Sequence, residues 1–408
     1  MLEVHMRSLI ARIIGCVTLV IVVLLPLFVS FESVADSAPQ ASFREHTIAT
    51  GLTGGYQVVV ADINHDGKPD VIGLASGLNE LAWFENPGWQ RHVLVSNVPR
   101  PINCAAMDLD GDGIPEIALA YEFSNDPSKS IGIVSLLKHN GDPLKSWEMT
   151  EIDRLSTSHR LRWADIEGNG KKVLINAPLV GSLAKAPDYK DAVPLVMYRQ
   201  GSWKREVISK ELQGVLHGVL IADWDNDRRE EILTASFTGV DLFSFGKNKS
   251  WRRTKLANGN PDPWPKGGSS EIAIGRLGRD RFLATIEPWH GNQVVVYHRN
   301  RESWQREVID SSLNDGHVLL TADLNKDGRD EIIAGYRGQG RSVYVYSADD
   351  RKGSRWSRQT LDDGGMGAAG CAVADLNGDG KLDVVCIGTA TANLKWYENI
   401  GGLYKNTR

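Results

Sequence analysis

The sequence has 408 residues, 42% of them hydrophobic, and a formal net charge of only −5. No segment is rich in lysine and arginine, so the chain lacks the basic signature of a nucleic-acid-binding protein. The length would fill two or three ordinary domains, but a chain of repeats can hold it in one closed body. The many glycines (41) and tryptophans (12) are typical of short strands joined by tight turns.

The N-terminal segment, residues 1–38, differs from the rest of the chain. Two arginines precede an apolar run over residues 13–31, and small residues at 33–35 have the pattern of a cleavage site. This layout is typical of a secretory signal. The run is also just long enough to span a bilayer as a retained anchor. Either way we expect residues 39–408 to be exported: secreted, periplasmic, or anchored to a membrane and facing outside.

The remaining chain repeats one pattern seven times. A short apolar strand leads into an acidic turn, and a second apolar strand follows; in the first copy the turn covers residues 62–70. The spacing of about 46 to 58 residues is the length of a four-stranded propeller blade. The seven turns begin at Asp62, Asp108, Asp165, Asp223, Arg276, Asp323 and Asp375.

A second periodic signal is an aromatic residue followed by an alternating strand. Six copies come after an acidic turn, but the seventh, at residues 43–48, comes before the first turn. The N-terminal strand would therefore supply the outer strand of the last blade and close the ring, which hides sheet edges. The sequence thus predicts an all-β fold, a seven-bladed β-propeller whose N-terminal strand closes the last blade. The six copies after the turns are residues 89–94, 147–152, 203–208, 251–256, 304–309 and 356–361.

The acidic turns place oxygen-bearing side chains at alternate positions around a glycine. Ca²⁺ takes six to eight oxygen ligands, and this spacing can supply them. We expect structural calcium there; the alternative is a polar turn that is empty or fills only at millimolar calcium. The complete copies are Asp62, Asn64, Asp66 and Asp70; Asp108, Asp110, Asp112 and Glu116; Asp323, Asn325, Asp327 and Glu331; and Asp375, Asn377, Asp379 and Asp383.

Three other copies of the turn are incomplete. The third lacks the closing acid, and the fourth has Arg228 where glycine is expected, which places its turn in question. In the fifth, Arg276 and Gly278 replace the first two ligands, so no metal is expected there. The pattern as a whole resembles the calcium loops of FG-GAP/VCBS propellers, including those of integrin α-subunits.

Three cysteines follow the N-terminal segment: Cys104, Cys371 and Cys386. An odd number argues against a disulfide framework, and all three lie in apolar strand patterns. We expect small buried side chains. A bridge between Cys371 and Cys386 within one blade stays open.

Three histidines share one register. His159, His217 and His317 each stand six residues before the first acidic-turn residue of their blade, at the start of an inner strand. Inner strands line the channel of a propeller, so these side chains should converge at its mouth, on the face away from the acidic turns. A lone histidine is usually a satisfied or solvated side chain, but three in one register predict a functional cluster. The same register holds Tyr56, Ile102, Ser270 and Ala369, with Asn103 and Glu271 one step on.

Loops on the same face add aromatic and charged groups that suit a sugar, because aromatic rings stack on sugar rings and arginine binds carboxylates. One chemistry is β-elimination, in which a histidine takes the proton, Tyr or a second His protonates the leaving oxygen, and Arg or a metal stabilises the enolate. The other role is a metal site holding Zn²⁺ or Mg²⁺. The two roles compete for the same histidines. The candidate catalytic residues are His159, His217, His290, His317, Arg160, Tyr336 and Arg337.

These short motifs resemble the propeller domain of aldos-2-ulose dehydratase and, more distantly, propeller lyases acting on rhamnosyl-glucuronate or ulvan linkages. The resemblance implies an exported lyase or dehydratase that eliminates across a uronic acid or keto sugar at the channel mouth. The alternative is a non-catalytic, calcium-stabilised propeller that binds glycan or protein there. The motifs are Arg160 in the histidine register, Trp289-His290-Gly291, Asp315-Gly316-His317 and Tyr336-Arg337.

Overall fold

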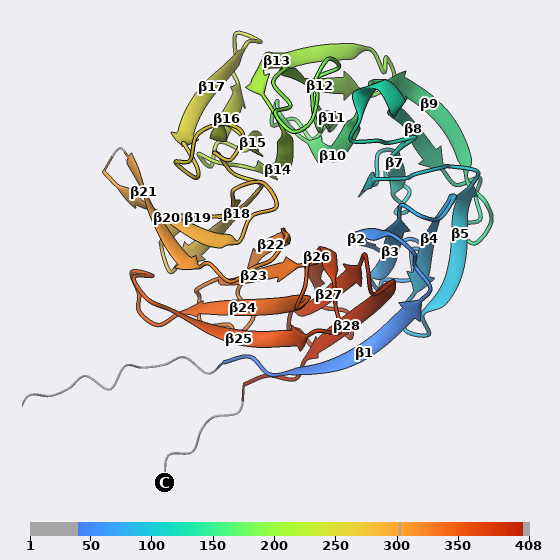
Figure 1. The fold of residues 1–408 in the computed structure, drawn as a ribbon. Coiled ribbons are helices and arrows are strands. Elements are labelled where there is room, and N and C mark those ends of the chain that lie inside the picture. Colours follow the sequence, from blue (N-terminus) through green and yellow to red (C-terminus); the bar gives the residue numbers. More distant parts are fainter. Residues whose placement is uncertain (1–39, 302, 403–408) are drawn as a thin grey trace, which may run out of the picture. The chain divides into compact units, whose positions relative to one another are not determined.

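The computed structural model describes residues 40–301 and 303–402. They form seven four-stranded antiparallel sheets arranged as blades in a ring (Figure 1), which confirms the predicted all-β seven-bladed propeller. The expected signal or anchor lies outside the described residues. Within them, no helix is long and apolar enough to cross a membrane.

Six blades run from an inner to an outer strand in chain order, and the seventh takes the first strand of the chain as its outer strand. Between the second and third strands of the second blade, η1 (Pro127–Lys129) is a short 3₁₀ turn. The first four blades are β2 (Gly55–Ala61), β3 (Asp70–Ala75), β4 (Glu80–Glu85), β5 (Gln90–Ser96); β6 (Asn103–Met107), β7 (Glu116–Tyr121), β8 (Ile133–Lys138), β9 (Glu148–Arg154); β10 (Ser158–Ala164), β11 (Val173–Pro178), β12 (Ala192–Arg199), β13 (Arg205–Gln213); and β14 (Leu216–Ala222), β15 (Glu231–Ser236), β16 (Gly239–Phe245), β17 (Trp251–Ala257). The last three are β18 (Glu271–Leu277), β19 (Asp280–Glu287), β20 (Gln293–Asn300), β21 (Ser303–Asp310); β22 (Gly316–Ala322), β23 (Glu331–Tyr336), β24 (Ser342–Ala348), β25 (Trp356–Asp363); and β26 (Ala368–Ala374), β27 (Asp383–Gly388), β28 (Asn393–Asn399) with β1 (Phe43–Thr50).

The N-terminal strand closes the ring as predicted. β1 pairs antiparallel with β28, from Phe43 opposite Asn399 to Thr50 opposite Asn393 (Figure 1). The last blade is therefore made from both ends of the propeller, and β28 has no free edge that could pair with another chain.

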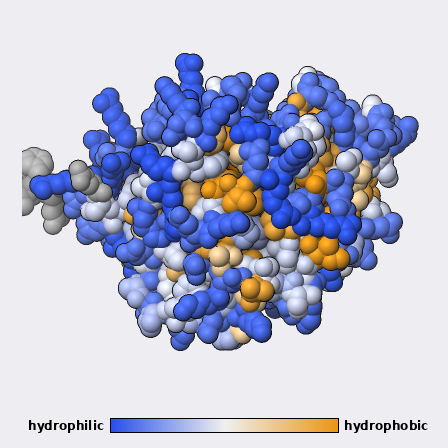
Figure 2. Space-filling view, turned by 90° about the horizontal axis from the view of Figure 1, so that it is seen from above, coloured by the Kyte–Doolittle hydropathy of each residue, from blue (hydrophilic) through white to orange (hydrophobic). Residues whose placement is uncertain are grey.

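The core lies between the blades. Seven hydrophobic clusters each join two neighbouring blades around the ring. The second strands explain this arrangement: β3, β7 and β23, for example, are buried along their whole length. A strand covered on both faces is expected to be apolar at nearly every position. Seen from the edge of the ring, the surface is mostly hydrophilic, with hydrophobic groups gathered near the middle (Figure 2).

The acidic turns are held by their own carboxylates. In the first turn Asp62 accepts hydrogen bonds from the backbone N–H groups of Asp66 (3.1 Å) and Gly67 (2.9 Å). The fourth turn keeps this geometry although it lacks the glycine. Arg228 takes the left-handed conformation (φ 73°) and donates its N–H to Asp223 at 3.0 Å. The doubt about that turn is therefore not borne out.

Two turns bring carboxylates together closely enough for one cation, with ligand atoms within 4.8 Å of one another: Asp108, Asp110 and Glu116 in the second turn, and Asp223, Asp225 and Glu231 in the fourth. In the second turn the ammonium of Lys138 forms ion pairs with Asp110 and Glu116, so a positive charge already lies there. Asp112, the remaining expected ligand of that turn, faces His139 at 2.8 Å.

The fifth turn is a tight hairpin in which Leu277 pairs with Asp280, quite unlike the acidic loops.

The first, sixth and seventh turns have the expected asparagine at their second position. Its Oδ1 atom accepts the backbone N–H of the third position at 3.0 to 3.2 Å, as in an ordinary polar turn. Its amide group donates to a nearby carboxylate, so the side chain is already satisfied on both sides. The pairs are Asn64 with Glu85 (3.2 Å), Asn325 with Glu331 (3.0 Å) and Asn377 with Glu398 (3.4 Å).

The third position of these turns also has a partner other than a metal. Asp327 accepts the backbone N–H of Arg329 at 2.8 Å on one oxygen and its Nε at 3.0 Å on the other. In the same way Asp379 is paired with the ammonium of Lys381. Among the described residues, the carboxylates of the first, sixth and seventh turns are not gathered within 4.8 Å of one another as those of the second and fourth are.

Calcium at the four complete copies therefore stays a prediction. Of the turns, the second and the fourth gather carboxylates within 4.8 Å of one another among the described residues, and the fourth is a copy whose turn the sequence places in doubt. In the other turns an ion would have to displace the contacts of Asn64, Asn325 with Asp327, and Asn377 with Asp379.

Blade seven contains a disulfide bond. Cys371 on β26 and Cys386 on β27 lie opposite each other in the sheet and are bonded. Of the two possibilities left open for this pair, the structure shows the bridge, because the strand register places the two side chains side by side. Cys104 is buried and free.

Candidate functional site

The inner strands turn their first residues toward the channel through β-bulges. The pairing between the first two strands shifts at the same position in five blades. A bulge leaves one residue out of the ladder and re-aims its side chain. The residues skipped by the pairing are Tyr56, His159, His217, His317 and Ala369.

The structure brings the three histidines of this register together with His290, which precedes β20. The ring centroid of His217 lies 5.1 Å from that of His159, 5.0 Å from that of His290 and 5.0 Å from that of His317. All four imidazoles are thus neighbours at the start of the inner strands. The acidic turns follow the other ends of these strands, so the two features occupy opposite faces.

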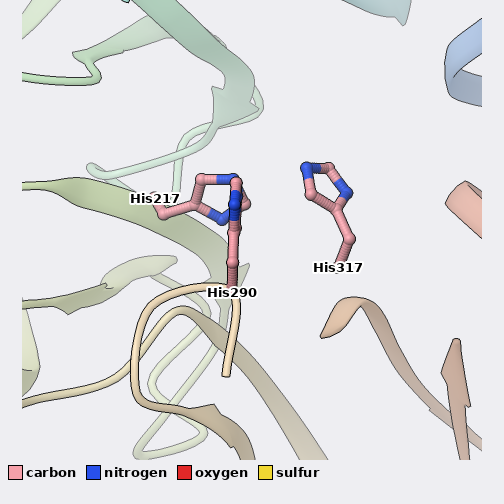
Figure 3. Close-up of side chains that lie close together, drawn as sticks. All are labelled: His217, His290 and His317. Atoms are coloured by element: carbon pink, nitrogen blue, oxygen red, sulfur yellow. The ribbon is translucent and has the colours of Figure 1, made fainter. Parts of the chain in front are cut away.

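Two of the imidazoles have their Nδ1 atom fixed by an oxygen. Nδ1 of His217 lies 2.7 Å from Oε1 of Glu271, and Nδ1 of His317 donates to the carbonyl oxygen of Ala369 at 2.6 Å. Each ring therefore carries its proton on Nδ1 and keeps a lone pair on Nε2. Nε2 of His317 is buried without a hydrogen-bond partner among the described residues, and Figure 3 shows it turned toward the other two rings.

His290 can take either tautomer. Its Nδ1 lies 3.2 Å from Asp315 and 3.1 Å from Nη2 of Arg337, while its Nε2 lies 3.3 Å from Nε2 of His217 (Figure 3). If Arg337 donates to Nδ1, the Nε2 proton points at His217. If Nδ1 donates to Asp315, two Nε2 lone pairs face each other, an arrangement that only a cation between them would stabilise.

The three Nε2 atoms have the spacing of a metal site. The ligand atoms of His217, His290 and His317 lie within 4.8 Å of one another. A tetrahedral zinc ion with bonds of about 2.0–2.1 Å needs neighbouring nitrogens roughly 3.3 Å apart, which is the separation between His217 and His290. An oxygen behind Nδ1 is also the usual arrangement for a metal-bound histidine. These residues fit a Zn²⁺-like ion better than Mg²⁺, which prefers oxygen.

His159 lies beside this triad in a different network. Its Nε2 is 2.7 Å from the hydroxyl of Tyr56 and 3.3 Å from Nη1 of Arg160. Because a guanidinium can only donate, Nε2 of His159 carries the lone pair. Arg160 also donates to Glu271 at 3.1 Å, so Glu271 links the two networks.

Burial controls the charge at this site. It lowers the pKa of His159, His290 and His317 well below that of an ordinary histidine, and nearby positive groups lower it further. The pKa of His217 is lowered less, because Glu271 opposes the effect of burial. Burial also disfavours the charged form of Glu271, but His217 and Arg160 outweigh it and hold the pKa of this carboxyl below its usual value. The imidazoles are therefore neutral at neutral pH.

Tyr336 does not join the other candidates. Its hydroxyl lies 3.4 Å from Ser342 and 3.5 Å from Tyr344, and its ring packs in the hydrophobic cluster between blades five and six. The prediction that places Tyr336 at the site is wrong. Side chains alternate along a strand, so Tyr336 at the end of β23 faces the neighbouring blade, whereas Arg337 beyond it reaches His290.

The tyrosine hydroxyl that contacts a histidine of the site is that of Tyr56. The sequence places Tyr56 in the register of the histidines but does not single it out as a catalytic residue. Glu271 and Asp315 were also missed as partners of the histidines, although Glu271 stands one step beyond the register and Asp315 lies in the motif of His317. Their positions were visible in the sequence, but their pairing across different blades was not.

The mouth has an aromatic wall on one side. Trp289 packs on His290 with ring centroids 4.6 Å apart and against Tyr189 at 5.6 Å. The connection between β11 and β12 (residues 179–191) and the stretch after β17 (residues 258–270) meet at this wall, where Trp264 donates from its indole to the carbonyl of Asp188 at 2.9 Å. Phe123 lies against His159, with ring centroids 5.4 Å apart.

Parts of the chain match two known families. Residues 131–300 match the β-propeller domain of aldos-2-ulose dehydratase, and residues 62–119 and 323–386 match FG-GAP-like repeats. The first match includes His159, His217, Glu271 and His290. No curated protein matches the sequence.

Similar solved structures have low sequence identity. A lectin of Agrocybe aegerita, solved for its recognition of non-reducing terminal N-acetylglucosamine, shares the fold with 15% identity and a TM-score of 0.51, and 85% of this chain and 86% of the lectin are covered. A rhamnogalacturonan lyase has 14% identity and a TM-score of 0.47, with 90% of this chain and 76% of the lyase covered. The chain is therefore a seven-bladed β-propeller with FG-GAP-like repeats, and its middle blades are similar in sequence to the propeller domain of aldos-2-ulose dehydratase.

Proposed function

We propose that this protein is an exported carbon–oxygen lyase that acts on a carbohydrate at the channel mouth. The observation that carries the proposal is that the four imidazoles form two groups with different partners. Three of them turn Nε2 toward a common point with oxygens behind Nδ1, while the fourth, His159, is paired with the hydroxyl of Tyr56. Metal binding and proton transfer, the two roles that compete for these histidines, can then use different residues.

The metal ligands would be His217, His290 and His317. A divalent ion held there would supply positive charge to stabilise the enolate that forms when the carbon loses its proton. Glu271 and Asp315 would orient two of the rings through Nδ1, and the Ala369 carbonyl would orient the third.

The proton would move through Tyr56 and His159. This pair takes the proton from the carbon next to the carboxylate or keto group, and the released electron pair forms the carbon–carbon double bond. The carbon–oxygen bond breaks, and the leaving oxygen receives a proton from the same pair. Arg160, 3.5 Å from the Tyr56 hydroxyl, is placed to stabilise negative charge on it.

The family match supports a carbohydrate-related role, because the matched segment carries three of the four imidazoles, His159, His217 and His290, together with Glu271. The aromatic wall of Trp289 and Tyr189 beside His290 suits stacking on a sugar ring. The disulfide supports export, since such bonds persist in oxidising compartments, and so does the apolar N-terminal segment. Calcium would fill acidic turns on the opposite face and stabilise the fold.

The test is an assay for unsaturated product. Metal-loaded protein is incubated with a panel of uronate-containing and neutral polysaccharides, and absorbance near 235 nm is followed. We expect product with at least one substrate and a large loss in His159→Ala. A panel without product, together with glycan binding that His159→Ala leaves unchanged, would replace the lyase by a non-catalytic glycan-binding propeller.

A further inference from the structure

A small cavity lies beside His317, between the inner strands. Its volume is about 120 Å³, and it is lined by inner-strand residues that include Tyr56, Asn103, Arg160, Arg162, Glu271 and His317. Since His317 and Arg162 line the same cavity, one ligand of a few atoms can contact both. The charges that face this cavity therefore bear on what the site accepts.

Arg162 is the unusual residue of this cavity. It lies on β10, two residues beyond Arg160 and on the same side of the strand. Its hydrogen-bond partners are neutral: Nη1 donates to the Leu161 carbonyl at 2.8 Å and to Oδ1 of Asn103 at 3.3 Å. Nε and Nη2 make no hydrogen bond with the described residues, and both remain available to a ligand.

The two other guanidinium groups at the mouth have carboxylate partners. Arg160 pairs with Glu271 at 3.1 Å, and Arg337 pairs with Asp315 at 2.8 Å. Within residues 40–301 and 303–402, Arg162 has no carboxylate within ion-pairing distance. Burial lowers its pKa to about 10, and the charge of Arg160 adds to this effect. Arg162 is therefore still positive at neutral pH.

The charges of the mouth do not balance. Three guanidinium groups face two carboxylates, so the guanidinium groups exceed the carboxylates by one, and Arg162 is the group without a carboxylate partner among the described residues. A divalent ion at the three imidazoles would increase this excess. A buried charge without a counter-ion is unfavourable, and a guanidinium with free donors matches a carboxylate through two parallel hydrogen bonds.

We propose that Arg162 binds the carboxylate of an acidic sugar, so that the channel accepts a uronic acid unit in preference to a keto sugar. This inference rests on the proposed carbohydrate function and narrows its substrate class. Arg162 acts as a specificity-determining residue. It selects the sugar by its charge, while His317 and Tyr56 line the same cavity.

The experiment measures binding without catalysis. The full chain is treated with a chelator selective for transition metals and titrated by calorimetry with glucuronate, galacturonate, acetate and neutral glucose. We expect the uronates to bind at least about tenfold more tightly than glucose or acetate, since the ion pair and the sugar contacts add. Arg162→Met should remove the preference for uronate over glucose, and Arg162→Lys should keep part of it.

Arg44→Met is the matched control, because Arg44 is 62% exposed and lies on the outer strand β1; it should bind as wild type does. Equal binding of glucuronate and glucose by the wild type would overturn the proposal, whether or not Arg162→Met folds. Acetate binding as tightly as glucuronate would show a simple anion site and would also overturn it.

Failure of this inference can be told apart from failure of the lyase function. Uronate selectivity without unsaturated product keeps the inference and removes the lyase. Product formed from a keto sugar, undiminished in Arg162→Met, keeps the lyase and removes the inference.

Discussion

At the residue scale, the structure places the hydroxyl of Tyr56 at the site and that of Tyr336 away from it, and this difference can be tested. Tyr56→Phe removes the hydroxyl that lies 2.7 Å from His159. We expect it to lower kcat by about 100- to 10,000-fold, the usual contribution of a general acid–base group. The measurement is the initial rate at 235 nm on the best substrate of the panel.

Tyr336→Phe is the matched control for this prediction. Its hydroxyl contacts only Ser342 and Tyr344 among the described residues, so its rate should stay close to wild type. A fall in Tyr336→Phe that equals the fall in Tyr56→Phe would contradict the placement of the two tyrosines.

Glu271 is a positioning residue, because it contacts His217 and Arg160. Replacing it in Glu271→Gln weakens the acceptor that fixes the His217 proton on Nδ1. We expect zinc affinity to fall about 10- to 100-fold, the usual effect of changing the partner of a metal-bound histidine. Calorimetric titration with Zn²⁺ measures it.

Glu211→Gln serves as the control, since this carboxylate is 73% exposed and pairs with Arg253 on the outer strands. Unchanged zinc affinity in Glu271→Gln would mean that His217 is not a ligand.

The site was only partly predictable at this scale. The register of His159, His217 and His317 follows from counting back from each acidic turn, and the bulges that re-aim them occur at that same count. Tyr336 is a candidate in the sequence because it precedes Arg337, but the alternation of a strand sends consecutive side chains to opposite sides. Glu271 meets His217 from the next blade, a contact between repeats that spacing within one repeat cannot reveal.

At the element scale, the strand β1 decides whether the ring closes. A variant that begins at residue 51 leaves β28 with an unpaired edge and removes one strand of blade seven. We expect lost cooperativity in thermal unfolding by circular dichroism and aggregation on size-exclusion chromatography.

A circular permutant keeps β1 in the sheet but changes its connection in the chain, and so tests whether pairing with β28 is what matters. Because Phe43 lies opposite Asn399, a short glycine-containing turn can join the end of β28 to β1 as a hairpin. This permutant should melt within a few degrees of wild type. If the variant that begins at residue 51 unfolds and elutes as the wild type does, β1 is not needed to close the ring.

Most of the fold could be predicted at this scale, because both strand periods and the acidic turns repeat seven times. The offset of the seventh aromatic strand identified the closure. The sequence leaves the Cys371–Cys386 disulfide open and cannot decide it, since only the pairing of β26 with β27 places the two cysteines opposite each other. The turn containing Arg228 is unexpected because an arginine rarely adopts a positive φ, yet it does so here.

The acidic turns could be located from the sequence, but their side-chain partners could not. Spacing shows where Asn325 and Asp327 stand in the loop. It does not show that the amide of Asn325 turns to Glu331 or that Arg329 approaches Asp327. Short polar side chains have several acceptors within reach in a tight turn, and the choice among them depends on the packed neighbours.

At the scale of the whole molecule, the two faces should respond to different metals. If calcium fills the acidic turns, it binds the folded chain and not the unfolded one, so millimolar Ca²⁺ should raise the melting temperature relative to chelated protein. Each site occupied at 100 times its Kd adds about 2.7 kcal/mol. Differential scanning calorimetry measures the shift, and Mg²⁺ at equal concentration should give a smaller one.

The acidic turns and the channel mouth should also be separable. Removing calcium alone should lower stability at moderate temperature without abolishing activity, because the imidazoles lie at the opposite ends of the inner strands. Loss of activity in parallel with calcium, and not with transition metal, would mean that the chemistry takes place on the face of the acidic turns.

The most direct test of the central claim is an anomalous difference map from crystals grown with Zn²⁺ and measured on both sides of the zinc absorption edge. We predict one zinc peak about 2.0–2.1 Å from Nε2 of His217, His290 and His317, with Tyr56 and His159 beside it. A map with no zinc at these imidazoles, or with their rings turned into the blades, would contradict the claim.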